Sequence, residues 1–87
     1  MYSIIITPAF EKTLRNYLKG NPDDKQKIIK SLSELITDPD HPSLRTHKLE
    51  DKNDWSLSLD MSNRITFEII DDHITLLNIG SHETVYI

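Results

Sequence analysis

Apolar and polar positions alternate along the last third of the chain. Apolar residues occupy every second position in segments 55–60 and 64–71, and a third apolar segment covers residues 73–79. A period of two with one apolar face is typical of a half-buried strand. The breaks at 60–63 and 71–72 contain turn-forming residues. We therefore expect three consecutive strands that form an antiparallel meander.

A helical period replaces this alternation in the first half of the chain. After a short β-branched strand at residues 2–6, Thr7 offers an N-cap hydroxyl and Pro8 suits the first helical position. Gly20 can take a positive φ and is expected to end that helix. A second start signal at 21–24 predicts a second helix. The apolar stripes expected to face the core are Phe10, Leu14, Tyr17 and Leu18, and then Ile28, Ile29, Leu32, Leu35 and Ile36.

The predicted elements combine into one α+β domain that covers residues 1–87. Two prolines and two aspartates make 37–43 a loop, and 44–49 leads into the meander. The order is β-α-α-β-β-β, with a helical hairpin packed on a small, largely antiparallel sheet. No apolar run approaches the roughly 20 residues of a membrane span, so no membrane role is expected. The apolar start lacks the positive region of a signal peptide.

The composition narrows the classes of function. The absence of cysteine excludes disulfides and thiolate zinc sites, and suits a cytoplasmic location. The net charge is −4, but residues 1–49 carry eight Lys and Arg against six Asp and Glu, whereas residues 50–87 carry two against eight. An acidic domain repels nucleic acid. A nucleic-acid role would therefore require a local basic face.

No strong local motif for catalysis or metal binding occurs. There is no phosphate-binding glycine loop, no His-x-x-x-His pair and no Gly-x-Ser-x-Gly elbow. Four histidines scattered along the chain do not by themselves form a metal site. We expect neither a metal nor a cofactor.

Five residues can nevertheless carry chemistry, and each also has an ordinary structural interpretation. Arg64 begins a strand on its polar phase, where it either pairs with nearby acids or clamps a phosphate through its guanidinium. His82 follows Gly80 and is either a surface histidine or a proton-transfer group at neutral pH. Tyr86 either closes the core or stacks on a base. His47 and Lys48 are either strand-edge polar residues or additional phosphate and proton-transfer groups.

The order and spacing of several segments resemble a known family. The segments are 48–49 (KL), 55–57 (WSL), 64–69 (RITFEI), 76–83 (LLNIGSHE) and 85–86 (VY). Together with the helices before them, they resemble the RelE/ParE toxin superfamily of type II toxin–antitoxin modules, and the resemblance covers the whole chain. The fold that this family implies is the arrangement predicted above.

The resemblance implies a function and assigns roles to residues. Many members of the family are ribosome-dependent mRNA endonucleases, in which the RNA 2′-hydroxyl attacks the neighbouring phosphate without a metal. By resemblance, Arg64 would hold the scissile phosphate, His82 would transfer protons and Tyr86 would position the RNA. His47 and Lys48 occupy a segment where members place further catalytic groups. The implied partners are a cognate antitoxin protein and mRNA on the ribosome.

Two departures from the family pattern keep alternatives open. Asn78 stands where some nucleases have a basic residue, and Arg45 aligns with a glutamate base of others. Other members of the superfamily inhibit DNA gyrase without catalysis. The sequence therefore leaves three alternatives: a translation-inhibiting mRNA endonuclease, a non-enzymatic gyrase inhibitor, and a toxin fold with attenuated activity.

Overall fold

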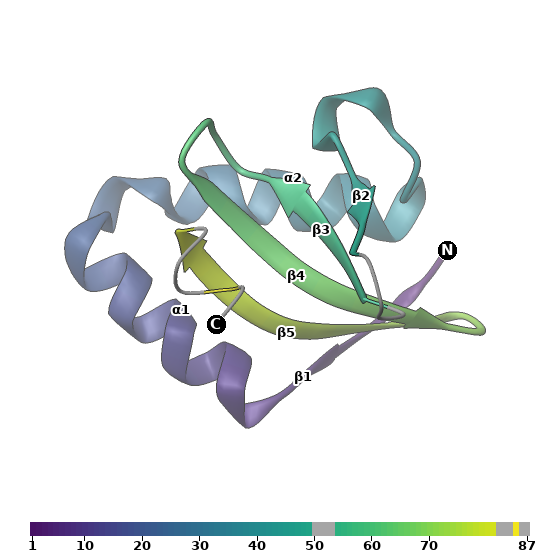
Figure 1. Ribbon diagram of the computed structural model, residues 1–87, viewed down its shortest axis with the longest axis horizontal. Coiled ribbons are helices and arrows are strands. Elements are labelled where there is room, and N and C mark those ends of the chain that lie inside the picture. Colours follow the sequence, from purple (N-terminus) through teal and green to yellow (C-terminus); the bar gives the residue numbers. More distant parts are fainter. Residues whose placement is uncertain (50–53, 82–84, 86–87) are drawn as a thin grey trace.

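A five-stranded mixed sheet organises the protein (Figure 1). The computed structural model describes residues 1–49, 54–81 and 85. Their elements, in chain order, are β1 (Ser3–Ile6), α1 (Pro8–Gly20), the 3₁₀ turn η1 (Pro22–Asp24), α2 (Lys25–Thr37), the 3₁₀ turn η2 (Pro42–Leu44), β2 (His47–Lys48), β3 (Asp54–Ser58), β4 (Asn63–Ile70) and β5 (His73–Ser81).

The strand order in the sheet is β1-β5-β4-β3-β2. β2, β3, β4 and β5 pair antiparallel in succession, which confirms the predicted meander, and β1 pairs parallel with β5. The pairing of β4 with β5 shifts between Thr66 and Phe67. Thr66 lies opposite Asn78 but Phe67 lies opposite Leu76, so Leu77 is the extra residue of a β-bulge. The fold is α+β and the sheet is largely antiparallel, as the sequence predicted.

The first helix begins where its N-terminal residues predict. The Thr7 hydroxyl oxygen accepts a hydrogen bond from the Phe10 backbone N–H at 3.1 Å, and Pro8 is the first helical residue. The same hydroxyl donates to the Leu76 carbonyl at 2.8 Å, which ties the helix start to β5. The helix ends at Gly20, as expected, but Gly20 does not have the positive φ that the sequence suggested. Asn21 caps this end instead: its side chain donates to the Tyr17 carbonyl at 3.0 Å.

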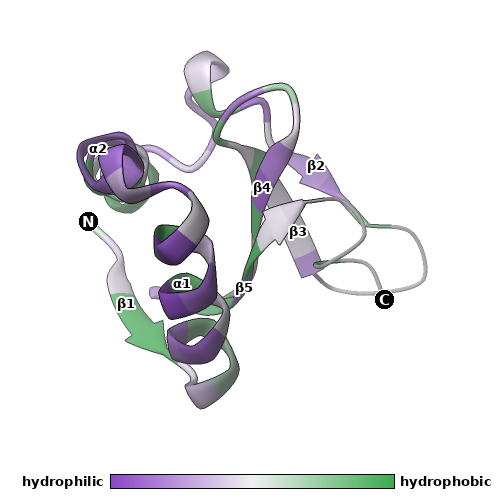
Figure 2. Ribbon diagram, turned by 90° about the vertical axis from the view of Figure 1, so that its left-hand side faces the viewer, coloured by the Kyte–Doolittle hydropathy of each residue, from purple (hydrophilic) through white to green (hydrophobic). Residues whose placement is uncertain are grey.

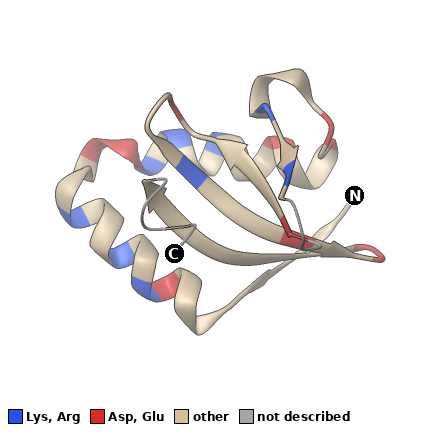
Figure 3. Ribbon diagram, viewed as in Figure 1, with Lys and Arg blue, Asp and Glu red and all other residues tan. Residues whose placement is uncertain are grey.

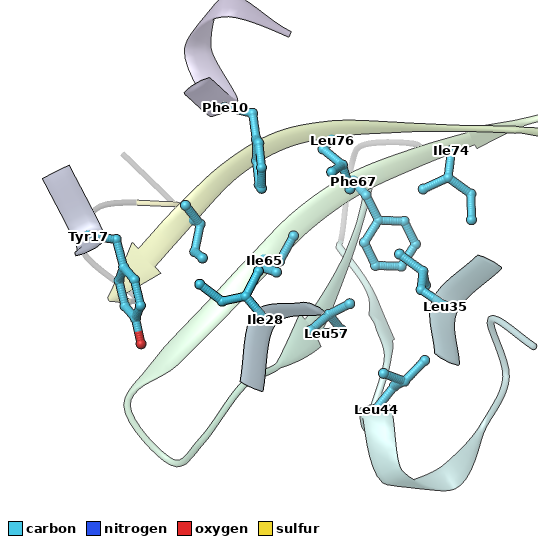
Figure 4. Close-up of a cluster of buried hydrophobic side chains, with 11 residues drawn as sticks. Phe10, Tyr17, Ile28, Leu35, Leu44, Leu57, Ile65, Phe67, Ile74 and Leu76 are labelled. Carbon is cyan, nitrogen blue, oxygen red and sulfur yellow. The ribbon is translucent and has the colours of Figure 1, made fainter. Parts of the chain in front are cut away.

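The helices cover one face of the sheet and bury their apolar stripes there (Figure 2). They follow each other through the short η1 connection and then diverge along the sheet. Ile29 was wrongly placed in the buried stripe of α2: it is 47% exposed, because the stripe that contacts the sheet is narrow. The central core residues are Phe10, Tyr17, Ile28, Leu35, Leu44, Leu57, Ile65, Phe67, Ile74, Leu76 and Ile79 (Figure 4).

Candidate functional site on the open face of the sheet

The sheet has a second face, turned away from the helices, and its side chains can be assigned from the strand register. Residues directly opposite each other in antiparallel strands point to the same face, and successive residues point to opposite faces. Ile65 and Phe67 of β4 point toward the helices and are fully buried. Arg64 and Thr66 therefore belong to this second face, which is called the open face below because neither α1 nor α2 covers it.

None of the described helices combines the length and the apolar character that crossing a membrane requires.

Arg64 lies in the first row of this face. It is opposite Ser58 on β3 and opposite Gly80 on β5. Its Nη1 donates a hydrogen bond to the Ser58 Oγ at 2.9 Å. Gly80 has a φ of 151°, a conformation that side chains rarely permit, and it adds no side chain beside the guanidinium. Among the described residues, no carboxylate forms an ion pair with Arg64.

The next row separates two residues that the sequence analysis grouped together. His47 lies opposite Ser56 and so shares the open face with Arg64, whereas Lys48 lies opposite Trp55, on the side of the helices. β2 and β4 are two strand spacings apart, or roughly 10 Å, a distance that a histidine and an arginine side chain can span together. The structure thus places Arg64 and His47 on one surface and Lys48 on another.

Ser56 occupies an unusual position in that row. Its side chain is only 1% exposed, and its Oγ has no hydrogen-bond partner in the described structure. Its neighbour Thr66 is also buried, and the Thr66 hydroxyl makes a long bond of 3.4 Å to the Asn78 carbonyl. The centre of the open face is therefore polar but shielded from water.

Acidic residues lie at the far end of the same face. Asp54 on β3 is opposite Glu68 on β4, two register positions beyond Ser56 and Thr66. Figure 3 shows the basic position of β4 and the acidic positions at the start of β3 toward different ends of the sheet. An anionic ligand would be attracted to the Arg64 end and repelled from the Asp54 end.

Two residues that the resemblance assigns to the site, His82 and Tyr86, lie outside the described residues. The strand that leads to them ends at Ser81, which pairs with Asn63, the residue before Arg64. Val85, between the two, is buried. Their roles therefore stay predictions.

The structure adds a basic residue that the sequence analysis did not select. Arg45 follows η2 and lines an open cleft of about 340 Å³ together with Ser58 and the β3–β4 turn. It has a left-handed backbone (φ 49°, ψ 52°), which is uncommon for a residue other than glycine. The sequence analysis noted Arg45 only as a departure from a glutamate of the family, because the cleft joins segments that are distant in the chain.

The β3–β4 turn at this cleft is held by Asp60. Burial opposes ionisation of the Asp60 carboxyl, but hydrogen bonds from the Ser62 and Asn63 N–H groups outweigh it and lower the pKa. Lys27 on α2 adds an ion pair at 3.4 Å. Through these contacts the Asp60 carboxylate holds the turn that precedes Arg64.

Metal-ligating side chains do not gather on this face. Within residues 1–49, 54–81 and 85, no three His, Asp or Glu side chains are arranged to hold a metal ion. The polar groups described on this face are guanidinium, imidazole and hydroxyl groups, with the carboxylates of Asp54 and Glu68 at its far end.

Solved structures with the same architecture cover nearly the whole chain. A metal-bound toxin from Helicobacter pylori shares 25% identity at a TM-score of 0.81, over 95% of this chain and 97% of that chain. YafQ in the DinJ–YafQ complex of E. coli shares 16% identity at 0.77, over 99% of each chain. A YoeB/ParE toxin from Agrobacterium tumefaciens shares 10% identity at 0.78, over 92% of this chain and 98% of that chain.

Sequence comparison alone does not detect this likeness: no protein-family model and no curated protein matches the chain. The likeness is found by comparing tertiary structures. The resemblance inferred from the segments between Lys48 and Tyr86 is confirmed at the level of the fold, and this chain has the fold of the RelE/ParE toxin superfamily.

Proposed function

We propose that this protein is the toxin of a type II toxin–antitoxin module and cleaves mRNA on the ribosome. The observation that carries the proposal is the position of Arg64. Its guanidinium is anchored on a rigid central strand by Ser58, is free of carboxylate partners in the described structure, and lies beside a glycine. A fixed, unpaired guanidinium on an open face is suited to a phosphate group.

The structural neighbours support a toxin role and a protein partner. They include toxins from three bacteria, and YafQ was solved in a toxin–antitoxin complex with DinJ. A cognate antitoxin is accordingly the proposed partner of this chain. By blocking the open face, such a partner would prevent access of RNA to Arg64.

The proposed reaction needs only groups that the chain supplies. The RNA 2′-hydroxyl loses its proton and attacks the adjacent phosphorus, the bond from phosphorus to the 5′-oxygen breaks, and that oxygen gains a proton. The products are a 2′,3′-cyclic phosphate and a 5′-hydroxyl end. Arg64 would stabilise the charge that develops on the phosphate oxygens, and His82 would transfer a proton. Tyr86 would stack on a neighbouring base.

His47 is the described residue best suited to a second proton transfer. It shares the face of Arg64, and an imidazole ring carries nitrogen atoms that can donate or accept a proton. By its register Lys48 points toward the side of the helices, and it lines a cleft with Trp55, Ile69 and the acidic Glu68. We therefore propose a supporting role for His47 in the reaction and assign Lys48 to binding outside the reacting centre.

The proposal is tested by induced expression in a bacterial host with mapping of mRNA 5′ ends. The wild type should arrest growth and produce in-frame cuts in translated messages, and the new ends should accept phosphate from a kinase, as 5′-hydroxyls do. Arg64→Ala and His82→Ala should each abolish the cuts. Arg15→Ala is the matched control, because Arg15 is on α1 and is paired with Glu11.

Other results would contradict the proposal in different ways. Growth arrest without cuts, retained in Arg64→Ala, would indicate a non-enzymatic inhibitor of the gyrase-binding type. No arrest by a folded wild-type protein would indicate a toxin fold with attenuated activity.

A further inference from the structure

The cleft at Arg45 is continuous with the surroundings of Arg64. Ser58 is the shared element, because it lines the cleft with Arg45 and its Oγ accepts the hydrogen bond from the Arg64 Nη1 at 2.9 Å. Ser58 thus contacts Arg64 and shares the cleft with Arg45, although the two arginines are far apart in the sequence. The cleft measures about 340 Å³ and is open to solvent.

Two charged residues line this cleft, Arg45 and Asp60. Arg45 makes no ion pair in the described structure, and neither does Arg64. The carboxylate that lines the cleft, Asp60, is engaged by the turn N–H groups and by Lys27 at 3.4 Å. Arg45 is therefore the charged residue of the lining that forms no ion pair in the described structure. A guanidinium without a carboxylate partner is suited to an anion.

The backbone of Arg45 is a second, independent observation. A left-handed conformation is costly for arginine, and residues held in such conformations concentrate at binding sites. Here the conformation follows a 3₁₀ turn whose end is fixed: the Arg45 N–H donates to the Pro42 carbonyl at 3.3 Å, and Leu44 is buried in the core. The backbone that carries the Arg45 side chain is therefore held in place.

We propose that Arg45 binds a second phosphate of the same single-stranded RNA, next to the phosphate held by Arg64. The inference deepens the proposed function and rests on it for the identity of the ligand as RNA. Arg45 and Arg64 would hold two points of the backbone, so they would fix the course of the strand on the sheet as well as its position. Asp54 and Glu68, at the acidic end of the face, would repel the phosphates of the RNA, so the RNA strand would not extend toward that end.

The test measures binding of a 2′-O-methyl RNA hexanucleotide, which has no free 2′-hydroxyl and cannot be cleaved. Fluorescence anisotropy between about 50 and 200 mM salt gives the slope of affinity against salt, which changes by about 0.7 for each phosphate contact of a single strand. Arg45→Gln and Arg64→Gln should each reduce the slope by about 0.7, and the double variant by twice that. Arg15→Gln, the matched control on α1, should leave the slope unchanged.

Neutral linkages identify which phosphate each arginine binds. In a series of hexanucleotides with one methylphosphonate each, two adjacent positions should weaken binding to the wild type. One of these two effects should vanish in Arg45→Gln and the other in Arg64→Gln. The inference is overturned if the wild type does not bind, if Arg45→Gln keeps the wild-type slope, or if every methylphosphonate effect persists in it.

The binding results and the cleavage results are separable. Binding with the expected slopes by a protein that makes no cuts would refute the nuclease proposal and retain the second phosphate site. Cuts lost in Arg64→Ala together with an unchanged salt slope in Arg45→Gln would retain the nuclease and refute the second site. Thermal melting of each variant verifies that it is folded.

Discussion

Arg45 is held in a conformation that its side chain does not favour. A left-handed residue other than glycine costs about 1 kcal/mol or more, and Arg45 has a φ of 49°. We expect Arg45→Gly to raise the free energy of unfolding by about 0.5–1 kcal/mol, since glycine removes this strain at some cost in chain entropy. Urea denaturation measures the change.

The same substitution in a helix provides the control. Arg15→Gly, in the middle of α1, should lower stability by about 1 kcal/mol because glycine is a poor helix former. If both variants were destabilised to the same extent, Arg45 would not be strained. If Arg45→Gly were more stable but bound RNA less tightly, the natural arginine would favour RNA binding at a cost in stability.

Ser56 buries a hydroxyl that has no partner among the described residues. An unsatisfied buried hydroxyl costs about 1–3 kcal/mol, whereas a methyl group of similar size does not. Ser56→Ala should therefore be stabilised by about 1 kcal/mol in urea denaturation. Ser58→Ala is the comparison, because it loses the bond from Arg64 and should be destabilised. A marked loss of stability in Ser56→Ala would show that its hydroxyl is bonded.

The short strand β2 carries His47 and Lys48, the two supporting residues suggested by the sequence, and separates their side chains. His47 lies opposite Ser56 and Lys48 lies opposite Trp55, so their side chains leave the sheet on different faces. His47→Ala should reduce mRNA cleavage about a hundredfold, the lower range for a proton-transfer group. Lys48→Ala should change the rate by a factor of about three or less, since a lost exposed charge has a small effect.

Rates of cleavage on purified ribosomes with saturating message measure this contrast. Both residues are exposed, so neither substitution should disturb the fold. The face assignment would be refuted if Lys48→Ala lost as much activity as His47→Ala.

A polar network of four side chains joins α1 and α2 to the β3–β4 turn. The Tyr17 hydroxyl on α1 donates to Asp24 at 2.5 Å, and Lys27 on α2 bridges Asp24 at 3.8 Å and Asp60 at 3.4 Å. Burial of the Tyr17 phenol, and then its bond to Asp24, raise its pKa well above the ordinary value. The network holds the turn in front of Arg64 against both helices.

This shift gives the wild type a pH dependence that Tyr17→Phe should lack. The folded pKa of Tyr17 is above its unfolded value of 10.0, so its contribution is complete below pH 10.0 and is lost as the pH rises beyond it. At neutral pH, Tyr17→Phe should be less stable by about 1.5–3 kcal/mol, because it loses a hydrogen bond to a charged group. The difference should shrink above the unfolded pKa. A difference that stayed constant in denaturation curves over this range would refute the coupling.

The sequence by itself determined the local structure and most of the core. The cap at Thr7, the helical stripe around Phe10 and the alternation around Phe67 depend on residues that are close in the chain, and each was confirmed. The end of α1 at Gly20 was also confirmed, but the Asn21 side chain caps it and Gly20 does not take a positive φ. Arg64 was selected because a lone arginine on the polar phase of a strand is conspicuous in sequence.

Only the tertiary structure decided how these elements meet. The parallel pairing of β1 with β5 joins residues some 70 positions apart, for example Ser3 with His73. The same holds for the site: the neighbours of Arg64 are set by strand register, and the cleft at Arg45 is formed where η2 approaches the β3–β4 turn. Such contacts depend on long-range packing, which periodicity does not encode.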